Sequence, residues 1–119
     1  MNRTPRIILV NNKGRCIIAT RDYYSKTVIL INPVLLIEVD ALAESSSFNA
    51  YPIRWTDTHN SIALGLINLL NHSEQPNCEL ICNYDDLTIT LRAITDIKSG
   101  EELVIKYACE LWFEPIKNI

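Results

Sequence analysis

One short segment of the sequence, from Asn71 to Cys78, is rich in side chains that could do chemistry. It reads Asn-His-Ser-Glu-Gln-Pro-Asn-Cys and follows an apolar run that ends at Leu70. The same amide, hydroxyl and imidazole groups also suit a turn, in which Asn71 and Ser73 hydrogen-bond to nearby backbone and Pro76 fixes the corner. Composition alone therefore favours a turn, and a chemical role needs support from elsewhere in the chain.

A metal site is a second kind of chemistry to consider, because Cys78 and Cys82 would point to one face of a strand with His72 nearby. Structural zinc sites use paired chelating residues on tight loops, such as Cys-x-x-Cys, and the sequence has no such pair. We therefore expect the two thiols to pack as small apolar groups, and we predict no metal site.

Length and composition place these residues in a small folded protein. The chain has 119 residues, 48% hydrophobic and 21% charged, which excludes disorder and favours one domain over residues 1–119. Its net charge of −3 lacks the basic excess typical of nucleic-acid-binding domains. No apolar run approaches the roughly 20 residues that cross a bilayer, and Ile7–Val10 is too short for a signal-peptide core. Without such a signal, the four cysteines indicate reduced thiols in an intracellular protein, cytoplasmic or nuclear.

The elements that must position the polar segment are mostly strands. Residues 87–93 alternate apolar and polar side chains, which is the period of a half-buried strand. Asp85-Asp86 would form the turn from a preceding strand over Cys78–Tyr84, and Lys98–Glu101 is a tight turn before a strand over Leu103–Tyr107. Further strands are expected over Ile7–Val10, Thr27–Asn32 and Val34–Val39, the last two divided by Pro33 at a sheet edge or corner.

The run Ile62–Leu70 fits a buried strand and a buried helix equally well. Four residues that can cap a helix N-terminus precede this run, and they favour a short helix: Asp57, Thr58, Asn60 and Ser61. One more helical turn is expected within residues 108–119.

Two segments taken together resemble the SET-domain family of protein-lysine methyltransferases. That family has Asn-His-Ser-x-x-Pro-Asn, then Ile-x-x-Gly-Glu-Glu-Leu, a strand and a tyrosine. The matching residues are Asn71, His72, Ser73, Pro76, Asn77, Ile97, Gly100, Glu101, Glu102, Leu103 and Tyr107. In addition, residues 14–22 are similar to the family's Gly-Arg-Gly-Val-Phe-Ala-x-Arg-Asp opening, and residues 51–55 to its Tyr-x-Phe-x-Trp element.

The resemblance implies both a fold and a reaction. SET domains are mostly β (α+β) proteins, a β-clip of small twisted sheets with a C-terminal pseudoknot that brings the Asn-His-Ser segment beside the strand ending at Tyr107. They transfer a methyl group from S-adenosylmethionine to a lysine side chain. A lysine in water has a pKa of about 10.4, and an apolar channel and the positively charged cofactor both lower that pKa. The protein then mainly aligns nitrogen, methyl carbon and sulfur.

Site residues follow from the resemblance position by position. Tyr107 matches the tyrosine whose hydroxyl lies beside the transferred methyl group, and Tyr51 matches the tyrosine that lines the lysine channel. Glu101 and Glu102 are expected to set the turn rather than touch substrate. The implied cofactor-binding residues are Gly14, Arg15, Cys16, Asn71, His72 and Trp112, and the implied substrate channel comprises Tyr51, Leu80 and Ile105.

Three of these aromatic residues also have plain structural interpretations. Tyr107 could be an aromatic residue that packs into the core at the end of a strand, and Tyr51 a surface residue in the loop before Pro52. Trp112 would cover the adenine by stacking or pack against the core near the C-terminus.

The chain departs from the family pattern in ways that affect activity. Cys16 and Ala108 stand where the family has glycine, and Leu111 stands where another tyrosine is frequent. Leu80 and Ile105 are aliphatic where phenylalanine or tyrosine often limits the number of methyl groups, so we expect that more than one could be added. These departures keep an alternative open, a catalytically inactive SET-fold binding module.

The expected partner is a protein that presents a lysine, either a histone or another basic protein. We expect no direct nucleic-acid partner and no membrane partner. A homodimer is a further hypothesis, because a minimal domain must form its lysine channel and cofactor lid from few residues.

Overall fold

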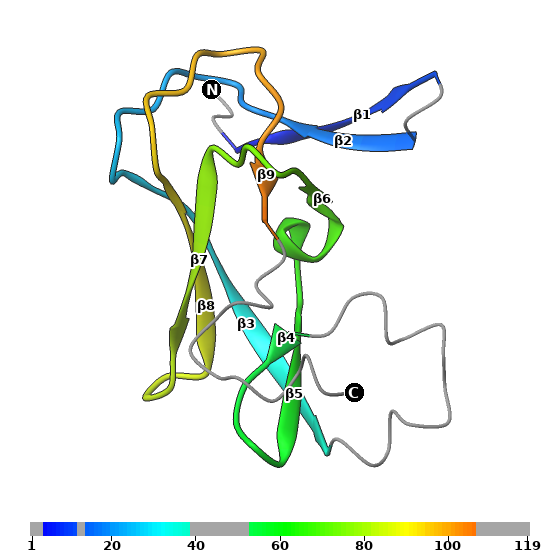
Figure 1. The fold of residues 1–119 in the computed structure, drawn as a ribbon, viewed down its shortest axis with the longest axis vertical. Coiled ribbons are helices and arrows are strands. Elements are labelled where there is room, and N and C mark those ends of the chain that lie inside the picture. Colours follow the sequence, from blue (N-terminus) through cyan, green and yellow to red (C-terminus); the bar gives the residue numbers. More distant parts are fainter. Residues whose placement is uncertain (1–3, 12–13, 39–52, 107–119) are drawn as a thin grey trace.

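The structure, a computed structural model, describes residues 4–11, 14–38 and 53–106, and almost all of its elements are strands (Figure 1). The predicted mostly-β fold is therefore confirmed. In chain order the elements are β1 (Arg6–Val10), β2 (Gly14–Ile18), β3 (Val28–Glu38), β4 (Ile53–Arg54), β5 (His59–Ala63), the 3-10 helix η2 (Leu66–Leu69), β6 (Asn71–His72), β7 (Cys78–Asn83), β8 (Thr88–Ala93) and β9 (Val104–Ile105).

The strands form two curled sheets. In one, β1 and β2 make an antiparallel hairpin, which projects to one side at the top of Figure 1. The other sheet has the strand order β4-β5-β3-β8-β7-β9-β6. The long strand β3 crosses the molecule and connects the lower strands β4 and β5 with the central pair β7 and β8 (Figure 1).

The sequence predicts two strands divided by Pro33. The structure instead has one continuous strand, β3, with Pro33 inside it. Residues 28–33 pair with β8, and residues 34–38 pair with β5. Pro33 therefore marks the point at which β3 changes its partner. Because proline has no backbone N–H to donate, it is better tolerated at such a change of partner than in the middle of a regular ladder.

The helix predicted over Ile62–Leu70 is only partly right. Its first residues belong to β5, which pairs with β3, and the 3-10 helix begins only at Leu66. None of the predicted capping residues caps this helix. A distant side chain bonds to its first turn instead: Asn32 on β3 accepts a hydrogen bond from the backbone N–H of Ile67 at 3.1 Å. A β-carbon on Gly65 would lie 2.6 Å from that Asn32 side chain. Glycine is therefore needed for the chain to pass Asn32 closely.

The hairpin of β7 and β8 forms as its alternating pattern predicts. On β8, the side chains of Ile89, Leu91 and Ala93 are buried, while the threonine and arginine side chains between them are only partly buried. Cys78 is buried in the same apolar cluster, and Cys82 packs against it. The expected apolar packing of these two cysteines is confirmed.

The strand β9 is inserted between two strands that are consecutive in the sequence. It pairs in parallel with β6 on one side, where Asn71 lies opposite Val104, and with β7 on the other, where Cys78 lies opposite Ile105. The segment from His72 to Cys78 therefore runs from one side of β9 to the other. This arrangement places the Asn-His-Ser segment beside the C-terminal strand, as the family resemblance implied. The continuation of the predicted pseudoknot from Tyr107 onward, and the predicted helical turn in 108–119, lie outside the described residues.

Asn77 fixes the backbone of β9 with both ends of its side-chain amide. Its Nδ2 donates to the carbonyl of Glu102 at 2.8 Å, and its Oδ1 accepts from the N–H of Val104 at 2.9 Å. The backbone N–H of Asn77 also donates to the carbonyl of Val104 at 3.3 Å. Since two partly buried backbone groups depend on this one amide, its loss would leave both without their partner.

We expect Asn77→Ala to lower the free energy of unfolding by about 2 to 3 kcal/mol, because it removes two side-chain hydrogen bonds and leaves their partners unpaired. Urea titration followed by circular dichroism measures this. Gln75→Ala is the matched control, since Gln75 is an exposed side chain in the same loop. Equal stability of the two variants would contradict the role given to Asn77.

Candidate functional site

Two of the predicted cofactor-binding segments, far apart in the sequence, meet in the structure. The Nδ2 of Asn71 on β6 donates to the backbone carbonyl of Arg15 on β2 at 2.7 Å and lies 3.8 Å from the sulfur of Cys16. Gly14 and Arg15 are exposed at the start of β2, whereas Cys16 is buried. The structure therefore brings Gly14, Arg15, Cys16 and Asn71 into one place, with His72 next to them in the chain.

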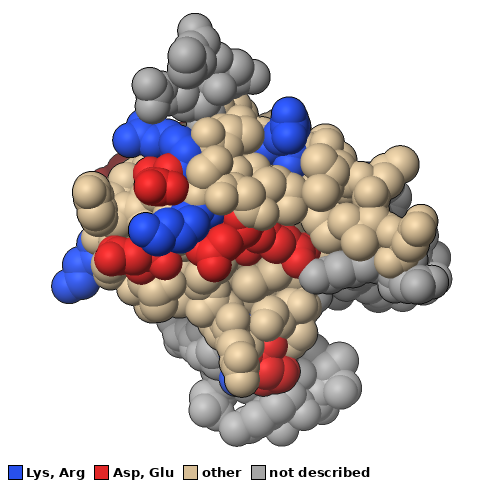
Figure 2. All heavy atoms as spheres, turned by 90° about the horizontal axis from the view of Figure 1, so that it is seen from above, with Lys and Arg blue, Asp and Glu red and all other residues tan. Residues whose placement is uncertain are grey.

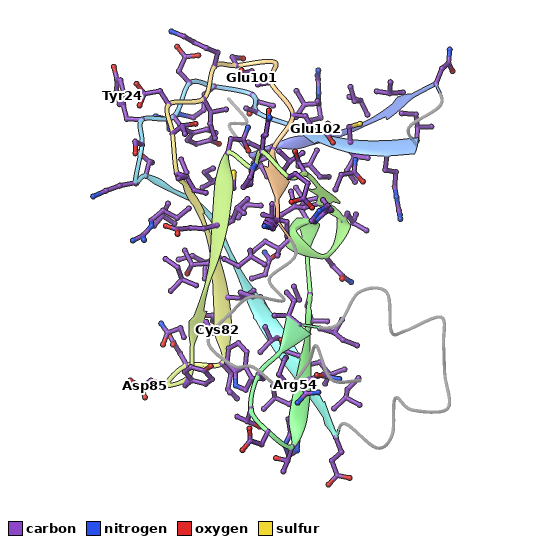
Figure 3. The ribbon with its side chains drawn as sticks, viewed as in Figure 1. Tyr24, Arg54, Cys82, Asp85, Glu101 and Glu102 are labelled. Carbon is purple, nitrogen blue, oxygen red and sulfur yellow. The ribbon has the colours of Figure 1, made fainter. Side chains whose placement is uncertain are left out.

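Glu102 completes this junction. Its carboxylate accepts a second hydrogen bond from Asn71 Nδ2, at 2.7 Å, and its backbone forms a bridge with Ile18 at the end of β2. Both hydrogens of the Asn71 amide are thereby used within the protein, which leaves Oδ1 as the side-chain atom available to a ligand. Figure 3 shows Glu102 beside the base of the β1–β2 hairpin.

The sequence does not reveal that Glu102 binds Asn71. Its position in the Gly-Glu-Glu-Leu turn suggested only that it shapes the turn. Its neighbour Glu101 does so, since its side chain accepts a hydrogen bond from the backbone N–H of Lys98 at 2.7 Å. Gly100 supplies the positive φ of +97° that this turn requires. No local pattern distinguishes the two glutamates, because the partner of Glu102 lies 31 residues away.

His72 presents its side chain at the surface. Its Nε2 lies 2.9 Å from a carboxylate oxygen of Glu74, and Lys106 Nζ lies 3.5 Å from the other oxygen. The hydrogen bond to His72, followed by the charge of Lys106, lowers the pKa of the Glu74 carboxyl. The backbone of His72 pairs with β9, so this residue links the Asn-His-Ser segment to the C-terminal strand through its main chain.

The two aliphatic residues of the predicted substrate channel lie in the same apolar cluster. Ile105 on β9 is buried, and Leu80 on β7 is partly buried and packs against the same group of side chains. That they line a lysine channel stays a prediction. Tyr51, Tyr107 and Trp112, and the departures at Ala108 and Leu111, lie outside the described residues.

We expect Asn71→Asp to destabilise the protein in a pH-dependent way. The new carboxylate would face Glu102, so one of the two would have a raised pKa in the folded protein. The folded state would then hold a proton that the unfolded state releases, and the loss of stability would grow as the pH rises from about 4 to about 7, reaching about 2 kcal/mol or more.

Urea titrations at both pH values test this expectation. Adding Glu102→Gln places an amide opposite the new carboxylate, so the double variant should regain most of the stability lost at neutral pH. A pH-independent loss, or a double variant less stable than Asn71→Asp alone, would contradict the contact.

Burial raises the pKa of the Cys78 thiol to about 12. At pH about 8, only about one molecule in ten thousand would then carry the reactive thiolate. We therefore expect Cys78 to resist iodoacetamide in the native protein and to react fully in urea, as read by peptide mass spectrometry. Native modification of Cys78 as fast as in urea would contradict its burial in the core.

Comparison with known proteins gives consistent matches. The SET domain family profile matches residues 14–108. A histone-lysine N-methyltransferase of Schizosaccharomyces pombe, named as specific for H3 lysine-37, is 31% identical over 105 residues, which are 86% of this chain and 71% of the yeast protein. The human histone-lysine N-methyltransferase SMYD3 is 54% identical over 41 residues, 34% of this chain and 9% of the human protein.

A solved structure supports the fold. The crystal structure of a Plasmodium falciparum protein assigned as a histone methyltransferase has a TM-score of 0.75 to this chain, at 19% sequence identity. The match covers 95% of this chain and 100% of the Plasmodium chain.

Among residues 4–11, 14–38 and 53–106, no helix is long and apolar enough to cross a membrane.

Proposed function

This chain belongs to the SET-domain family, and on that premise we propose that it is a protein-lysine N-methyltransferase that uses S-adenosylmethionine. The observation that carries the proposal is the junction at Asn71, which joins β2, β6 and the turn at Glu102. The family resemblance matched these segments as separate motifs in the sequence. The side-chain amide of Asn71 bonds to both of the others, so all three lie at one place.

The chemical groups at this junction suit the amino-acid end of S-adenosylmethionine. The guanidinium of Arg15 is exposed and can pair with a carboxylate. Asn71 Oδ1 can accept a hydrogen bond from an ammonium or amine group. The thiol of Cys16 is buried, so the replacement of the family glycine leaves the surface at Gly14 and Arg15 open. We assign the binding role to Gly14, Arg15, Cys16, Asn71 and His72, with Trp112 covering the adenine.

When bound, S-adenosylmethionine supplies a methyl group activated by a positively charged sulfur. The residues of this chain would orient and desolvate the substrate amine. Leu80 and Ile105 offer apolar side chains that lower the pKa of a lysine between them, and Tyr51 would line the same channel. The hydroxyl of Tyr107, two residues after β9, would lie beside the transferred methyl group. Because Leu80 and Ile105 carry no hydroxyl to hold a water molecule against the amine, we propose that more than one methyl group can be added.

The proposed substrate is a lysine in a histone or another basic protein. The names of both matched relatives support a histone, and the net charge of −3 suits a basic segment. A homodimer that completes the site is a separate hypothesis, and nothing in this proposal depends on it.

We expect Tyr107→Phe to reduce methyl transfer by roughly 100-fold while leaving cofactor binding intact, because the hydroxyl acts at the reacting centre. Transfer of labelled methyl from S-adenosylmethionine to histones and cell extract measures activity, and calorimetry measures binding. Tyr24→Phe is the matched control, since Tyr24 is 78% exposed on a loop of the described chain.

Each outcome of this experiment has a definite meaning. Labelling that survives in Tyr107→Phe would refute the role of Tyr107. Cofactor binding without labelling by the wild type would favour the inactive binding module. If the wild type neither binds the cofactor nor transfers the label, the chain would resemble the family in its fold only.

A further inference from the structure

The β1–β2 hairpin carries apolar side chains that the rest of the molecule leaves open. Leu9 is 80% exposed, Ile7 44% and Val10 39%. Within the described residues β1 pairs with β2 alone, and no other described strand pairs with its second edge. An exposed apolar edge strand is a ready template for the addition of another strand.

The charge of this region is opposite to that of the remaining sequence. The first 21 residues contain five of the eleven Lys and Arg, and none of the 14 Asp and Glu: Arg3, Arg6, Lys13, Arg15 and Arg21. Residues 22–119 therefore hold the other six basic residues and every acidic residue. In the end-on view of Figure 2, acidic side chains gather across the middle of the molecule, and the right-hand side, where Figure 1 places the hairpin, shows neither acidic nor basic side chains.

Both faces of the hairpin at β1 carry apolar side chains and one arginine. Ile7 and Leu9 lie on one face, opposite Ile17 and Arg15 of β2. Arg6 lies on the other face with Ile8 and Val10. A strand added to the open edge of β1 would thus meet apolar side chains on both faces, with Arg15 of β2 opposite Leu9 on one face and Arg6 on the other.

Charge decides among the partners that could use this edge. A second copy of the chain would bring two basic hairpins together. A nucleic acid would satisfy the arginines but would leave Ile7 and Leu9 against sugars and phosphates. We propose that the open edge of β1 binds an extended segment of a partner protein in which apolar and acidic residues alternate. The apolar residues would pack on Ile7 and Leu9, and the acidic residues would lie over the other face, where one of them would pair with Arg6 beside Ile8 and Val10. This inference stands on the hairpin alone and does not require the proposed function.

A fluorescein-labelled peptide of alternating valine and glutamate tests this proposal by anisotropy. We expect binding that weakens with added salt and falls at least about 10-fold in Leu9→Glu, which opposes the peptide's charge and removes its apolar contact. Leu9 is exposed, so this variant should fold, as circular dichroism would verify. Leu35→Glu is the matched control, because Leu35 is 51% exposed on β3 and should leave binding unchanged.

A modified peptide tests whether the peptide binds by backbone hydrogen bonds to the edge of β1. A version of the peptide with alternate amide nitrogens methylated cannot add as a strand and should not bind. In amide NMR spectra of the full chain, the unmodified peptide should shift residues 6–10 most.

Several results would overturn the proposal. One is that a valine–lysine peptide binds as tightly as the valine–glutamate peptide. Another is that Leu35→Glu weakens peptide binding as much as Leu9→Glu does. No binding by the wild type at millimolar peptide would also reject it. A dimer that Leu9→Glu dissociates would assign the edge to a second copy, and duplex DNA that displaces the peptide would assign it to nucleic acid.

Discussion

The insertion of β9 between β6 and β7 is the constraint on which the rest of the structure depends. Parallel pairing on both sides gives a strand of two residues an interior place in its sheet, one strand from the edge. Asn77 holds its backbone from one side, while Asn71 and Glu102 tie the preceding turn to β2. Without β9 in that position, β6 would lose the strand that pairs with it beside the junction at Asn71.

The polar segment from Asn71 to Asn77 is therefore scaffold and candidate site at once. The side-chain amides of Asn71 and Asn77 are used inside the protein, on β2, on Glu102 and on β9. The groups that remain open to a ligand at this junction are the Oδ1 of Asn71, the exposed residue His72, and exposed groups at Gly14 and Arg15 of β2. A substitution in this segment would thus disturb the fold and the proposed chemistry together, which is why stability and binding need separate measurements.

Local features were predictable from the sequence, and long-range pairings were not. The alternation on β8 and the turn at Gly100 depend on neighbouring residues, and both were found. The continuity of β3 through Pro33, and the division of Ile62–Leu70 into strand and 3-10 helix, depend on strands far along the chain. Periodicity cannot reveal such pairings, since a short apolar run fits strand and helix equally well. The place of β9 and the site residues in its neighbourhood came from family resemblance alone, because threaded arrangements are rare.

The position of β9 also has a consequence for biosynthesis. A nascent chain emerges from the ribosome with its N-terminal part first, so β6 and β7 are made before the strand that must come to lie between them. Until then, the Asn77 amide lacks its partners and the edges of β6 and β7 face a gap. Closing this gap requires contacts between distant parts of the chain, which form slowly. The junction of Asn71 with Glu102 would thus be completed only after the segment that contains Glu102 and β9 has been made.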